Sequence, residues 1–488
     1  MNIIPFLAAL SLVPAPRTVV ETGGVCALTN PVEAVCYAKD ASLPPEGYRL
    51  VVKADSVSVA SSDAAGAFYA RQTLRQLGKP APCVEIEDYP AYPWRGVLID
   101  ESRHFLGKVT VKRVLDQMAY HKLNVLHWHL TDDQGWRLDV PGFPDLVRYG
   151  SKRAASPLLG TGHRRVNGET VCELDGVPYG PYFYTEADVR EIVAYAAERH
   201  ITIMPEIEVP GHVYTALCAY PEFACFPENL AKRSPRCHWG IEKDVLCVGN
   251  PDAIRFYERI FDYVCSVFPS KVIHIGGDEC PRVRWKECPK CQRFIAEHKL
   301  GGEDGLQAWV TRHFAEYLGK KGRRIIGWEE CVSSGEAPKD AIGMVWRMHG
   351  KGGAGTRFMK PDEIVARGHD VVMTPTVFCY HDYKQGLADD PYQYIGGNVT
   401  LEKAYSFDPV AGIPAESRSH VLGGQSNCWG EYIWNWIDLE WKMWPRAAAI
   451  AEVLWTNPTP RDFADFERRM TTHRKRLIDA RINCAPLR

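Results

Sequence analysis

Eight short apolar runs, each ending in polar residues and each followed by a helix-like stretch, constrain the fold of this chain more than any other feature. The runs are RGVLIDES, NVLHWHLTDD, ITIMPEIEVPGH, KVIHIGGDE, RRIIGWEE, AIGMVWR, DVVMTPTVFCYHDY and VLGGQSNCWGE. Continuous apolar runs bounded by turn residues are typical of strands buried on both faces. Eight such strands, alternating with helices, close a parallel barrel. The pattern therefore predicts an α/β protein with a (β/α)8 TIM barrel over residues 93–488.

The segment before the barrel, residues 14–92, has a different pattern. YRLVVKADSVSVAS alternates apolar and polar residues, as half-buried strands do. AAGAFYARQTLRQLG carries Phe68, Leu74 and Leu77 at helical spacing, and Gly78 marks the end of that helix. We therefore expect a small α+β domain, with a mixed or antiparallel sheet and a helix, in front of the barrel.

The first residues, MNIIPFLAALSLVPAPR, bear on cellular location. Ile3 to Val13 form a short apolar stretch, although no Lys or Arg precedes it and no cleavage site is evident. We take residues 1–13 as a candidate signal peptide and expect a secreted or periplasmic protein. No apolar run approaches the roughly 20 residues of a membrane span. The formal net charge of -2 offers no basic surface for nucleic acid or an anionic membrane.

Polar and aromatic residues accumulate at the predicted carboxyl ends of the strands, where the active site of such a barrel lies. Helix N-caps and solvated strand ends account for a few polar residues there, but nearly every run in this chain ends in them. The convergence predicts one site formed by Asp132, Asp133, Glu206, His212, Asp278, Glu279, Trp328, Trp346, Tyr380, Asp382, Trp429 and Glu431.

The stretch VIHIGGDEC places two adjacent acids, Asp278 and Glu279, after a Gly-Gly pair. Neighbouring strand residues point to opposite faces, so both acids can serve one site only where the backbone turns. Gly276 and Gly277 allow such a turn. Two close carboxylates raise at least one pKa, which suits a group that donates a proton near neutral pH. The alternative is a strand-end salt bridge or a helix N-cap.

Two further motifs leave alternatives open. HWHLTDDQGWR places His127 and His129 on one strand face. Two such imidazoles can chelate a metal, but no third ligand is evident from the spacing, and a buried hydrogen-bonded network is the alternative. In PEIEVPGH, Glu206 and Glu208 share a strand face before a turn that carries His212; ordinary turn chemistry is the alternative.

Three tryptophans, Trp328, Trp346 and Trp429, fall at predicted strand ends. A single tryptophan there is usually a core residue, but three at matching ends would wall a pocket. Tyr380 would offer its hydroxyl to that pocket, with a place on a surface loop as the alternative.

The chain has 16 cysteines, and several are close in sequence, such as Cys280, Cys288 and Cys291 in CPRVRWKECPKC. The spacing of Cys288 and Cys291 is that of a CxxC motif, which raises a structural zinc site. A second CxxC is absent, so disulfides in an exported protein, or free thiols, compete with zinc.

The motifs together resemble glycoside hydrolase family 20, the β-N-acetylhexosaminidases. The matching stretches are WRGVLIDESRHF, KLNVLHWHLTDDQGWR, PEIEVPGH, HIGGDE, GWEE, YHDY and GGQSNCWGE. They occur in the family's order and cover nearly the whole barrel, and FYARQTLRQL is similar to the small domain that precedes it. Departures are small: VPGH replaces the commoner MPGH, and Cys428 and Gly430 in NCWGE differ from many members.

The resemblance implies a retaining mechanism in which the substrate's own acetamido group is the nucleophile and an oxazolinium ion forms. Glu279 matches the general acid, which protonates the leaving oxygen and later deprotonates water. Asp278 matches the residue that orients the acetamido N–H and stabilises the positive charge. Tyr380 matches the donor to the acetamido oxygen.

The resemblance also assigns sugar-binding roles. Arg95 matches a ligand of the hydroxyls at C3 and C4, and Asp382 and Glu431 match further hydroxyl ligands. Asp132 and His274 match a chain that hydrogen-bonds to Glu279 and tunes its acidity. The walls around the acetamido methyl and the sugar face match Trp328, Trp346 and Trp429.

Three functions are consistent with these motifs and with the resemblance. The first is an exo-acting β-N-acetylhexosaminidase that removes terminal GlcNAc or GalNAc from glycans. The second is a family 20 lacto-N-biosidase, which releases a disaccharide from a wider pocket. The third is a non-catalytic sugar-binding barrel, which predicts loss of the acid or its partners, whereas Asp278, Glu279 and Tyr380 are all present. The chemistry demands no cofactor, and the sequence gives no indication of the oligomeric state.

Overall fold

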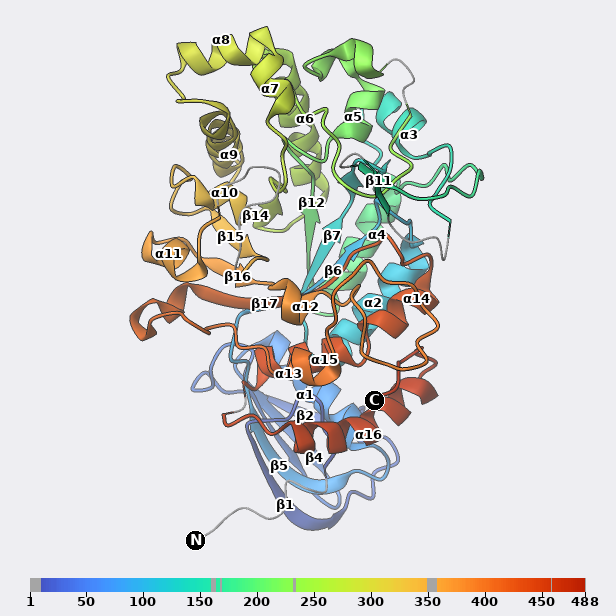
Figure 1. Cartoon of the computed structure of the whole chain (residues 1–488). Coiled ribbons are helices and arrows are strands. Elements are labelled where there is room, and N and C mark those ends of the chain that lie inside the picture. Colours follow the sequence, from blue (N-terminus) through green and yellow to red (C-terminus); the bar gives the residue numbers. More distant parts are fainter. Residues whose placement is uncertain are drawn as a thin grey trace.

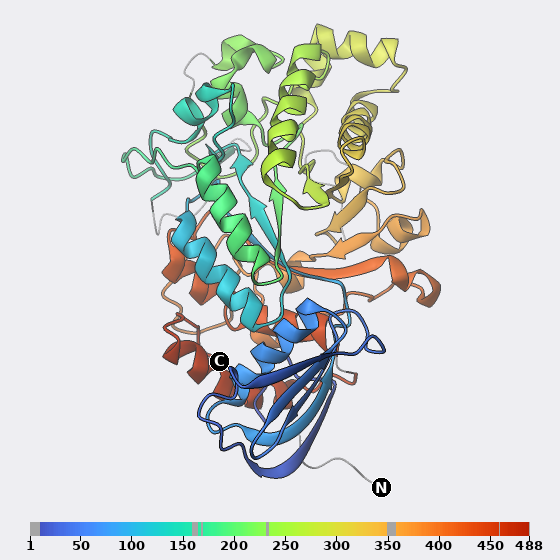
Figure 2. The ribbon, with the colours of Figure 1, turned by 180° about the vertical axis from the view of Figure 1, so that it is seen from behind.

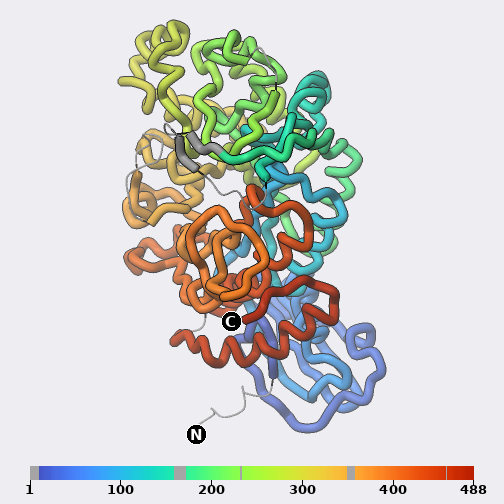
Figure 3. Tube along the Cα trace, turned by 45° about the vertical axis from the view of Figure 1, so that its right-hand side comes forward, coloured from blue at the N-terminus to red at the C-terminus, as the bar shows by residue number. Residues whose placement is uncertain are grey.

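The computed structural model describes residues 10–158, 164–166, 169–230, 234–348, 358–457 and 459–487. The chain forms a small N-terminal domain, blue in Figure 1, and a larger barrel domain above it. The last helix, α16 (Phe463–Asp479), returns to lie beside the small domain, as the red end of the tube in Figure 3 shows.

A five-stranded mixed sheet and one helix form the small domain. The strand order is β1-β5-β3-β4-β2; the β2–β4 pair is parallel and the other pairs are antiparallel. Helix α1 packs on β3 and β4, and Asp63 caps it by accepting a hydrogen bond from the Gly66 amide. The expected α+β domain is therefore confirmed. Its elements are β1 (Thr18–Val25), β2 (Val35–Lys39), β3 (Tyr48–Val52), β4 (Val57–Ser61), α1 (Ala64–Leu77) and β5 (Pro82–Asp88).

Eight parallel strands close the barrel in the order β12-β13-β14-β15-β16-β17-β6-β7. Each of the eight apolar runs contains one of these strands, so the TIM-barrel prediction is confirmed. Pairing of β17 with β6, from Gly423–Trp94 to Cys428–Ile99, closes the cylinder. The strands are β6 (Trp94–Asp100), β7 (Val125–His129), β12 (Thr202–Glu206), β13 (Val272–His274), β14 (Arg324–Trp328), β15 (Ile342–Val345), β16 (Val371–Met373) and β17 (Val421–Cys428).

Barrel strands are buried on both faces, as their continuous apolar runs require. All seven residues of β6 are buried. Leu98 packs inside the barrel with Met204 and Met344, whereas its neighbours Val97 and Ile99 pack outward, in the core shared with the helices. Packing on both faces fixes the strands in place, so the residues at the strand ends have fixed positions as well.

Helices surround the barrel; α2 and α4 lie side by side on its back in Figure 2. Thr185 and Asp188 form a capping box at the start of α4. The segment after β17 forms two helices and not one, because Pro445 has no amide hydrogen to continue the first. The helices are α2 (Gly107–Tyr120), α3 (Pro144–Gly150), α4 (Glu186–Ala197), α5 (Tyr214–Ala219), α6 (Pro251–Val267), α7 (Val283–Glu287), α8 (Pro289–Glu297), α9 (Glu303–Gly319), α10 (Glu330–Ser333), α11 (Pro361–Ala366), α12 (Thr376–Cys379), α13 (Leu401–Tyr405), α14 (Trp436–Met443) and α15 (Arg446–Trp455).

The long connections leave the carboxyl ends of the strands. Strand β7 ends at His129 and α4 begins at Glu186, whereas α4 ends at Ala197 and β12 begins at Thr202. The residues that could form a binding site therefore lie at one end of the barrel. These connections hold β8 (Thr131–Asp132), β9 (Gly135–Trp136), β10 (Arg164–Val166), β11 (Glu169–Val171), and the short 3-10 helices η1 (Pro221–Phe223), η2 (Pro227–Leu230) and η4 (Ala415–His420).

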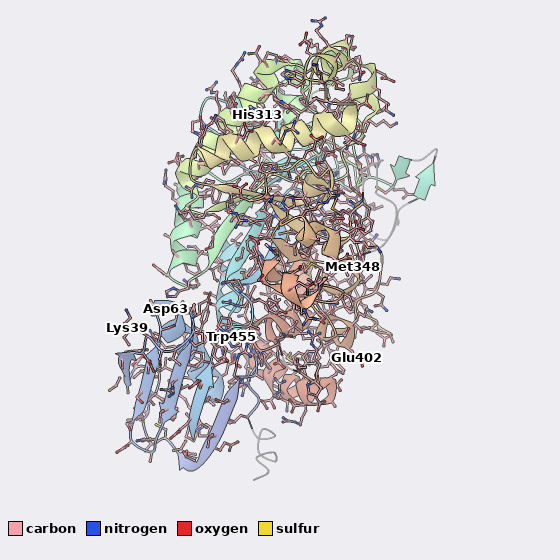
Figure 4. All side chains as sticks on the ribbon, turned by 90° about the vertical axis from the view of Figure 1, so that its left-hand side faces the viewer. Lys39, Asp63, His313, Met348, Glu402 and Trp455 are labelled. Carbon is pink, nitrogen blue, oxygen red and sulfur yellow. The ribbon has the colours of Figure 1, made fainter. Side chains whose placement is uncertain are left out.

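A buried ion pair joins the two domains at the opposite end. Lys122, just after α2, places its Nζ 2.7 Å from Asp88 Oδ2 on β5, and both side chains are at most 1% exposed. Asp88 also accepts hydrogen bonds from the Tyr48 hydroxyl at 2.7 Å and from the Trp455 indole at 2.9 Å. Trp455, labelled in Figure 4, lies where the domains meet and belongs to the core of the small domain. One carboxylate therefore ties four segments of the chain together.

The candidate signal peptide, residues 1–13, is described only in part, because residues 1–9 lie outside the described residues. Leu12 and Val13 are buried. Arg469 donates a hydrogen bond to the Leu12 carbonyl, and Gln76 accepts one from the Val13 amide. A cut after residue 13 would therefore remove packed side chains from the fold. Within the described part of the chain, no helix has the length and apolar character needed to cross a bilayer.

Replacing Asp88 with alanine should lower the free energy of unfolding by about 3–5 kcal/mol, because the Lys122 charge would stay buried without its partner. Urea denaturation followed by tryptophan fluorescence measures the loss. Glu87→Ala is the matched control: the neighbouring carboxylate pairs with Arg49 at the surface, with side chains 43% and 46% exposed. It should cost at most about 0.5 kcal/mol. Equal losses in the two variants would contradict the role of the buried pair.

Candidate active site

A cavity of about 210 Å³ opens at the carboxyl ends of the barrel strands, and each of the eight strands contributes to its lining through its last residue or the segment after it. Ten of the predicted site residues line it, whereas Asp133, Glu206, Arg95 and His274 do not. The lining consists of Arg103, Asp132, His212, Asp278, Glu279, Trp328, Trp346, Tyr380, Asp382, Tyr383, Ile395, Gly396, Trp429 and Glu431.

Asp278 and Glu279 reach the same cavity because the backbone turns after β13, as their motif predicts. Gly276 and Gly277 have φ of +66° and +92°, and a Cβ on Gly276 would lie 1.8 Å from an oxygen of Glu208. Only glycine fits these two positions. Glu279 itself has φ of +45°, a left-handed conformation that non-glycine residues rarely adopt. The side chain of Asp278 is 15% exposed and that of Glu279 is 30% exposed.

His212 lies between two pairs of acids. Its Nε2 is 3.8 Å from Asp278 Oδ2 and 3.7 Å from Glu279 Oε2. Its Nδ1 is 3.1 Å from Asp132 Oδ1 and 3.3 Å from Asp133 Oδ2. Burial alone would lower the pKa of His212, but the Asp132 and Asp278 carboxylates raise it well above its usual value. The imidazole therefore holds a proton, and it lies among four carboxyl groups.

His274 has a different place from the one implied by the resemblance. It is fully buried under the cavity, and its Nδ1 lies 2.8 Å from Glu206 Oε1, not against Glu279. The route from Asp132 to Glu279 runs through His212. His274 is the last residue of β13, and its side chain points into the barrel below the turn that carries the acids.

The histidines of HWHLTDDQGWR belong to a buried polar network around Glu206. His127 Nε2 lies 2.9 Å from Glu206 Oε2, and His129 Nδ1 hydrogen-bonds the same oxygen. The Trp328 indole donates a hydrogen bond of 2.9 Å to Glu206 Oε1. Despite burial, the His274 and His129 charges hold the pKa of Glu206 well below its usual value. The carboxylate is thus ionised, and it fixes Trp328 in the cavity wall.

Arg95 lies at the wrong end of its strand for a sugar ligand, so that prediction is wrong. It is the second residue of β6, at the amino end, and its side chain is fully buried. The guanidinium pairs with Glu46 of the small domain and donates hydrogen bonds to the carbonyl oxygens of Tyr92 and Lys122. It belongs to the domain junction.

The arginine that does line the cavity is Arg103, which follows the carboxyl end of the same strand. Its Nη1 lies 2.9 Å from Asp100 Oδ2, and its Nη2 lies 2.8 Å from Asp132 Oδ2. Its Nε donates a hydrogen bond to Gln134. Although burial opposes it, the Asp132 and Asp100 charges raise the pKa of Arg103 well above its usual value. The guanidinium is therefore a fixed cation at the cavity edge.

Aromatic rings form the walls, as their strand-end positions predict. Trp328 and Trp429 have ring centroids 5.6 Å apart, and Tyr380 lies 6.3 Å from Trp429. The Trp346 indole donates a hydrogen bond of 3.2 Å to Glu330, which holds that ring. The walls are apolar surfaces anchored by polar edges, as suits a flat ligand that also carries hydroxyl groups.

Three carboxylate oxygens in this cavity are buried and have no hydrogen-bond partner among the described residues: Asp278 Oδ1, Asp382 Oδ1 and Glu431 Oε2. Burial raises the pKa of Asp278 and that of Asp382 to about 8, and it also raises that of Glu431. Buried acceptors normally have donors. The arrangement therefore suits a ligand that brings several O–H or N–H donors of its own.

The cysteine prediction needs a correction. Cys288 and Cys291 cluster with Cys225 and Cys247, whereas Cys280 is buried against Gly211 beside the cavity and is not part of that cluster. None of the four clustered thiols lines the cavity. All 16 cysteines lie in the described part of the chain, where none forms a disulfide.

Four lining residues are not among those predicted from the sequence: Arg103, Tyr383, Ile395 and Gly396. Two carried a signal, because Arg103 lies in the stretch WRGVLIDESRHF and Tyr383 in YHDY. Position along the strand separates Arg103 from Arg95, since only the carboxyl end faces the site. Ile395 and Gly396 lie in a loop with no motif.

Comparisons with known proteins identify the family of this chain. The family model of the glycosyl hydrolase family 20 catalytic domain matches residues 92–458, and that of domain 2 of the same family matches residues 27–89. A beta-hexosaminidase of Porphyromonas gingivalis is 39% identical over 455 residues, 90% of this chain, and the chain spans 54% of that relative's length. A beta-hexosaminidase of Akkermansia muciniphila is 33% identical over 481 residues, 96% of this chain and 91% of the relative. A crystal structure of the family 20 exo-β-N-acetylglucosaminidase of Vibrio harveyi with N-acetylglucosamine matches with a TM-score of 0.82 at 27% identity, covering 98% of this chain and 79% of that one. The chain belongs to glycoside hydrolase family 20.

Proposed function

We propose that the chain is an exo-acting, retaining β-N-acetylhexosaminidase that removes terminal β-linked GlcNAc or GalNAc by substrate-assisted catalysis. The proposal rests mainly on the different surroundings of two adjacent acids, Asp278 and Glu279. Asp278 is the more enclosed and has an unpartnered buried oxygen, whereas Glu279 is about twice as exposed. One acid is placed to hold a group of the bound sugar, and the other to exchange protons with a leaving group or water.

In the first half of the proposed reaction, the carbonyl oxygen of the sugar's acetamido group attacks C1. The bond between C1 and the leaving oxygen breaks, and Glu279 gives its proton to that oxygen. In its ionised form, Asp278 accepts the acetamido N–H and offsets the positive charge of the oxazolinium ion. The Tyr380 hydroxyl, which lines the same cavity, donates to the acetamido oxygen and holds it in line.

In the second half, water attacks C1 from the side that the leaving group vacated. Glu279, now a carboxylate, accepts the proton of that water, and the oxazolinium opens to restore the acetamide. Two displacements at C1 retain the β configuration. His212, within 4 Å of both acids, positions them and balances their charge as the proton moves.

Sugar binding falls to the remaining lining residues. Asp382 and Glu431 supply unpartnered oxygens for ring hydroxyls, and Arg103 takes the role that the resemblance assigned to Arg95. The tryptophan walls would pack on the acetamido methyl and the sugar face. The cavity, about 210 Å³, is below the roughly 300–1,000 Å³ typical of drug-sized ligands, which favours a single terminal sugar over a disaccharide.

A substrate panel separates the two family 20 activities. Wild type should release the aryl group from aryl β-GlcNAc or aryl β-GalNAc directly, with β-configured monosaccharide as first product by NMR. Inactivity on both, with release from an aryl β-lacto-N-bioside, would establish the disaccharide-releasing alternative instead.

Glu279→Gln should lower kcat about 10²- to 10⁴-fold on a glycoside with a poor leaving group, because the leaving oxygen needs a proton. On a substrate with a nitro-substituted phenol as leaving group, the loss should be much smaller, since that oxygen leaves without one. Steady-state kinetics on the pair of substrates measures the difference. Glu297→Gln, an exposed glutamate on α8, is the control and should match wild type. Equal losses on both substrates would remove Glu279 from the acid role.

Asp278→Asn should abolish most activity and raise thermal stability at alkaline pH. The folded pKa of Asp278 is raised to about 8, above its unfolded value near 4, so ionisation destabilises the fold. The stabilising contribution is complete below about pH 4 and is lost as pH rises through about 8. The gain in Tm of Asp278→Asn over wild type should therefore grow from about pH 5 to about pH 9.

The exposed Asp55→Asn is the control and should show no such trend. A Tm difference for Asp278→Asn that does not change with pH would contradict the burial of this carboxylate. A thiazoline mimic of the oxazolinium should inhibit wild type tightly, and it should bind Asp278→Asn more weakly.

Arg103→Lys and Arg95→Lys should have opposite signatures. Lysine cannot reproduce the planar fork that Arg103 extends to Asp100 and Asp132. Arg103→Lys should lower kcat/KM on aryl β-GlcNAc about tenfold or more, through a rise in KM. Arg95→Lys should lower Tm with KM unchanged. A KM effect of Arg95→Lys that equals that of Arg103→Lys would contradict their places at opposite ends of β6.

A further inference from the structure

Four cysteines that the catalytic proposal does not use converge outside the active-site cavity. Cys225 follows η1, Cys247 precedes α6, and Cys288 and Cys291 lie at the start of α8. The Sγ atoms of Cys225 and Cys291, of Cys247 and Cys288, and of Cys247 and Cys291 are each 3.8 Å apart. All four Sγ atoms lie within 4.8 Å of one another.

These separations have the dimensions of a tetrahedral metal site. Zinc binds cysteine sulfur at about 2.3 Å, and the edge of a tetrahedron with that radius is about 3.8 Å. A disulfide requires about 2.05 Å, so no pair of these sulfurs is bonded. The sulfurs surround one point, whereas two disulfides would draw them into separate pairs.

The setting is that of a structural metal site. Cys247, Cys288 and Cys291 are at most 1% exposed and Cys225 is 9% exposed, so no fifth position is open to water. Closed four-cysteine sites are structural, whereas catalytic zinc sites keep an open position. The backbone at Gly249 approaches so closely that a Cβ there would lie 2.3 Å from the carbonyl of Lys290, beside Cys291.

We propose that Cys225, Cys247, Cys288 and Cys291 bind one structural zinc ion. Binding exchanges four S–H protons, released to solvent, for four Zn–S bonds, with no change of oxidation state. Iron also accepts four thiolates in this geometry, and metal analysis separates the two.

The zinc would fasten two of the long connections at the active-site end. One leads from β12 to α6 and supplies Cys225 and Cys247; the other follows β13 and supplies Cys288 and Cys291. Contacts beside the cluster already link them: the Trp285 indole donates to the Leu246 carbonyl at 2.9 Å. Leu246 in turn donates its amide to Pro210, two residues before His212. Figure 1 shows α7 and α8 at the top of the molecule, far from the small domain.

The test is metal analysis of the full chain, purified without added metal. Mass spectrometry of the elements should find about one zinc per chain. A mercurial thiol reagent added to the folded wild type should release that zinc stoichiometrically to a colorimetric chelator. Cobalt supplied in place of zinc should give the visible absorption of a tetrahedral tetrathiolate site. Protein with no bound metal, with iron instead of zinc, or with disulfides among these four cysteines would overturn the proposal.

Variants locate the site. Cys291→Ser and Cys225→Ser should each lose most of the zinc and melt at lower temperature. Cys484→Ser, which removes a buried cysteine outside the cluster, should keep a full equivalent of zinc. If the cluster variants do not fold, the release experiment on wild type still decides the stoichiometry. A folded Cys291→Ser protein with full zinc, or loss of zinc in Cys484→Ser, would overturn the assignment to these four residues.

Discussion

Closure of the eight-stranded sheet is the constraint on which the site depends. Pairing of β17 with β6 brings the last strand of the barrel against the first, more than 300 residues earlier in the chain. The segments beyond their ends are then joined directly: the Gly430 amide donates to Asp100 Oδ2 at 2.9 Å, and the Gly430 carbonyl accepts from His104. Trp429 and Glu431 thereby share a cavity with Arg103. These residues are far apart in the sequence, and they form one wall of the cavity only because the barrel closes.

The acids at the carboxyl ends of the barrel strands differ in the cations that lie near them. Glu206 has three histidines around it, and Asp132 has Arg103 and His212; the pKa of each carboxyl is held well below its usual value. Burial raises the pKa of Asp382 to about 8, although the charges of Lys442 and Arg446 oppose the shift. Asp278, Asp382 and Glu431, whose pKa values burial raises, line the cavity, and each has an oxygen without a hydrogen-bond partner among the described residues. Carboxylates paired with cations keep the side chains of the site in position, whereas carboxyl oxygens without a hydrogen-bond partner are available to a ligand.

The sequence predicted strands, strand ends and most of the site, because apolar runs and the polar residues after them are local features. The predictions that failed depended on features that neighbouring residues in the sequence do not reveal. A motif contains both Arg95 and Arg103, and only the strand direction tells which one reaches the mouth. His274 precedes Asp278 and Glu279 in its motif, whereas His212 lies in a different motif, and only the backbone turn after β13 decides which imidazole faces Glu279. The four cysteines come from two connections, so a single CxxC could not reveal Cys225 and Cys247 as their partners.

The backbone around His212 connects the turn that carries Glu279 with the cysteine cluster. Glu279 and His212 both have left-handed backbones, with φ of +45° and +50°, at a cost of about 1–3 kcal/mol each. Such residues persist only where their surroundings hold them. On one side, Gln307 donates a hydrogen bond to the Gly277 carbonyl. On the other, Leu246 holds the Pro210 carbonyl one residue from the cluster. A metal that fixes Cys247 would therefore act through Leu246 on the backbone that presents His212 to both acids, so its removal should disturb catalysis by geometry rather than by chemistry.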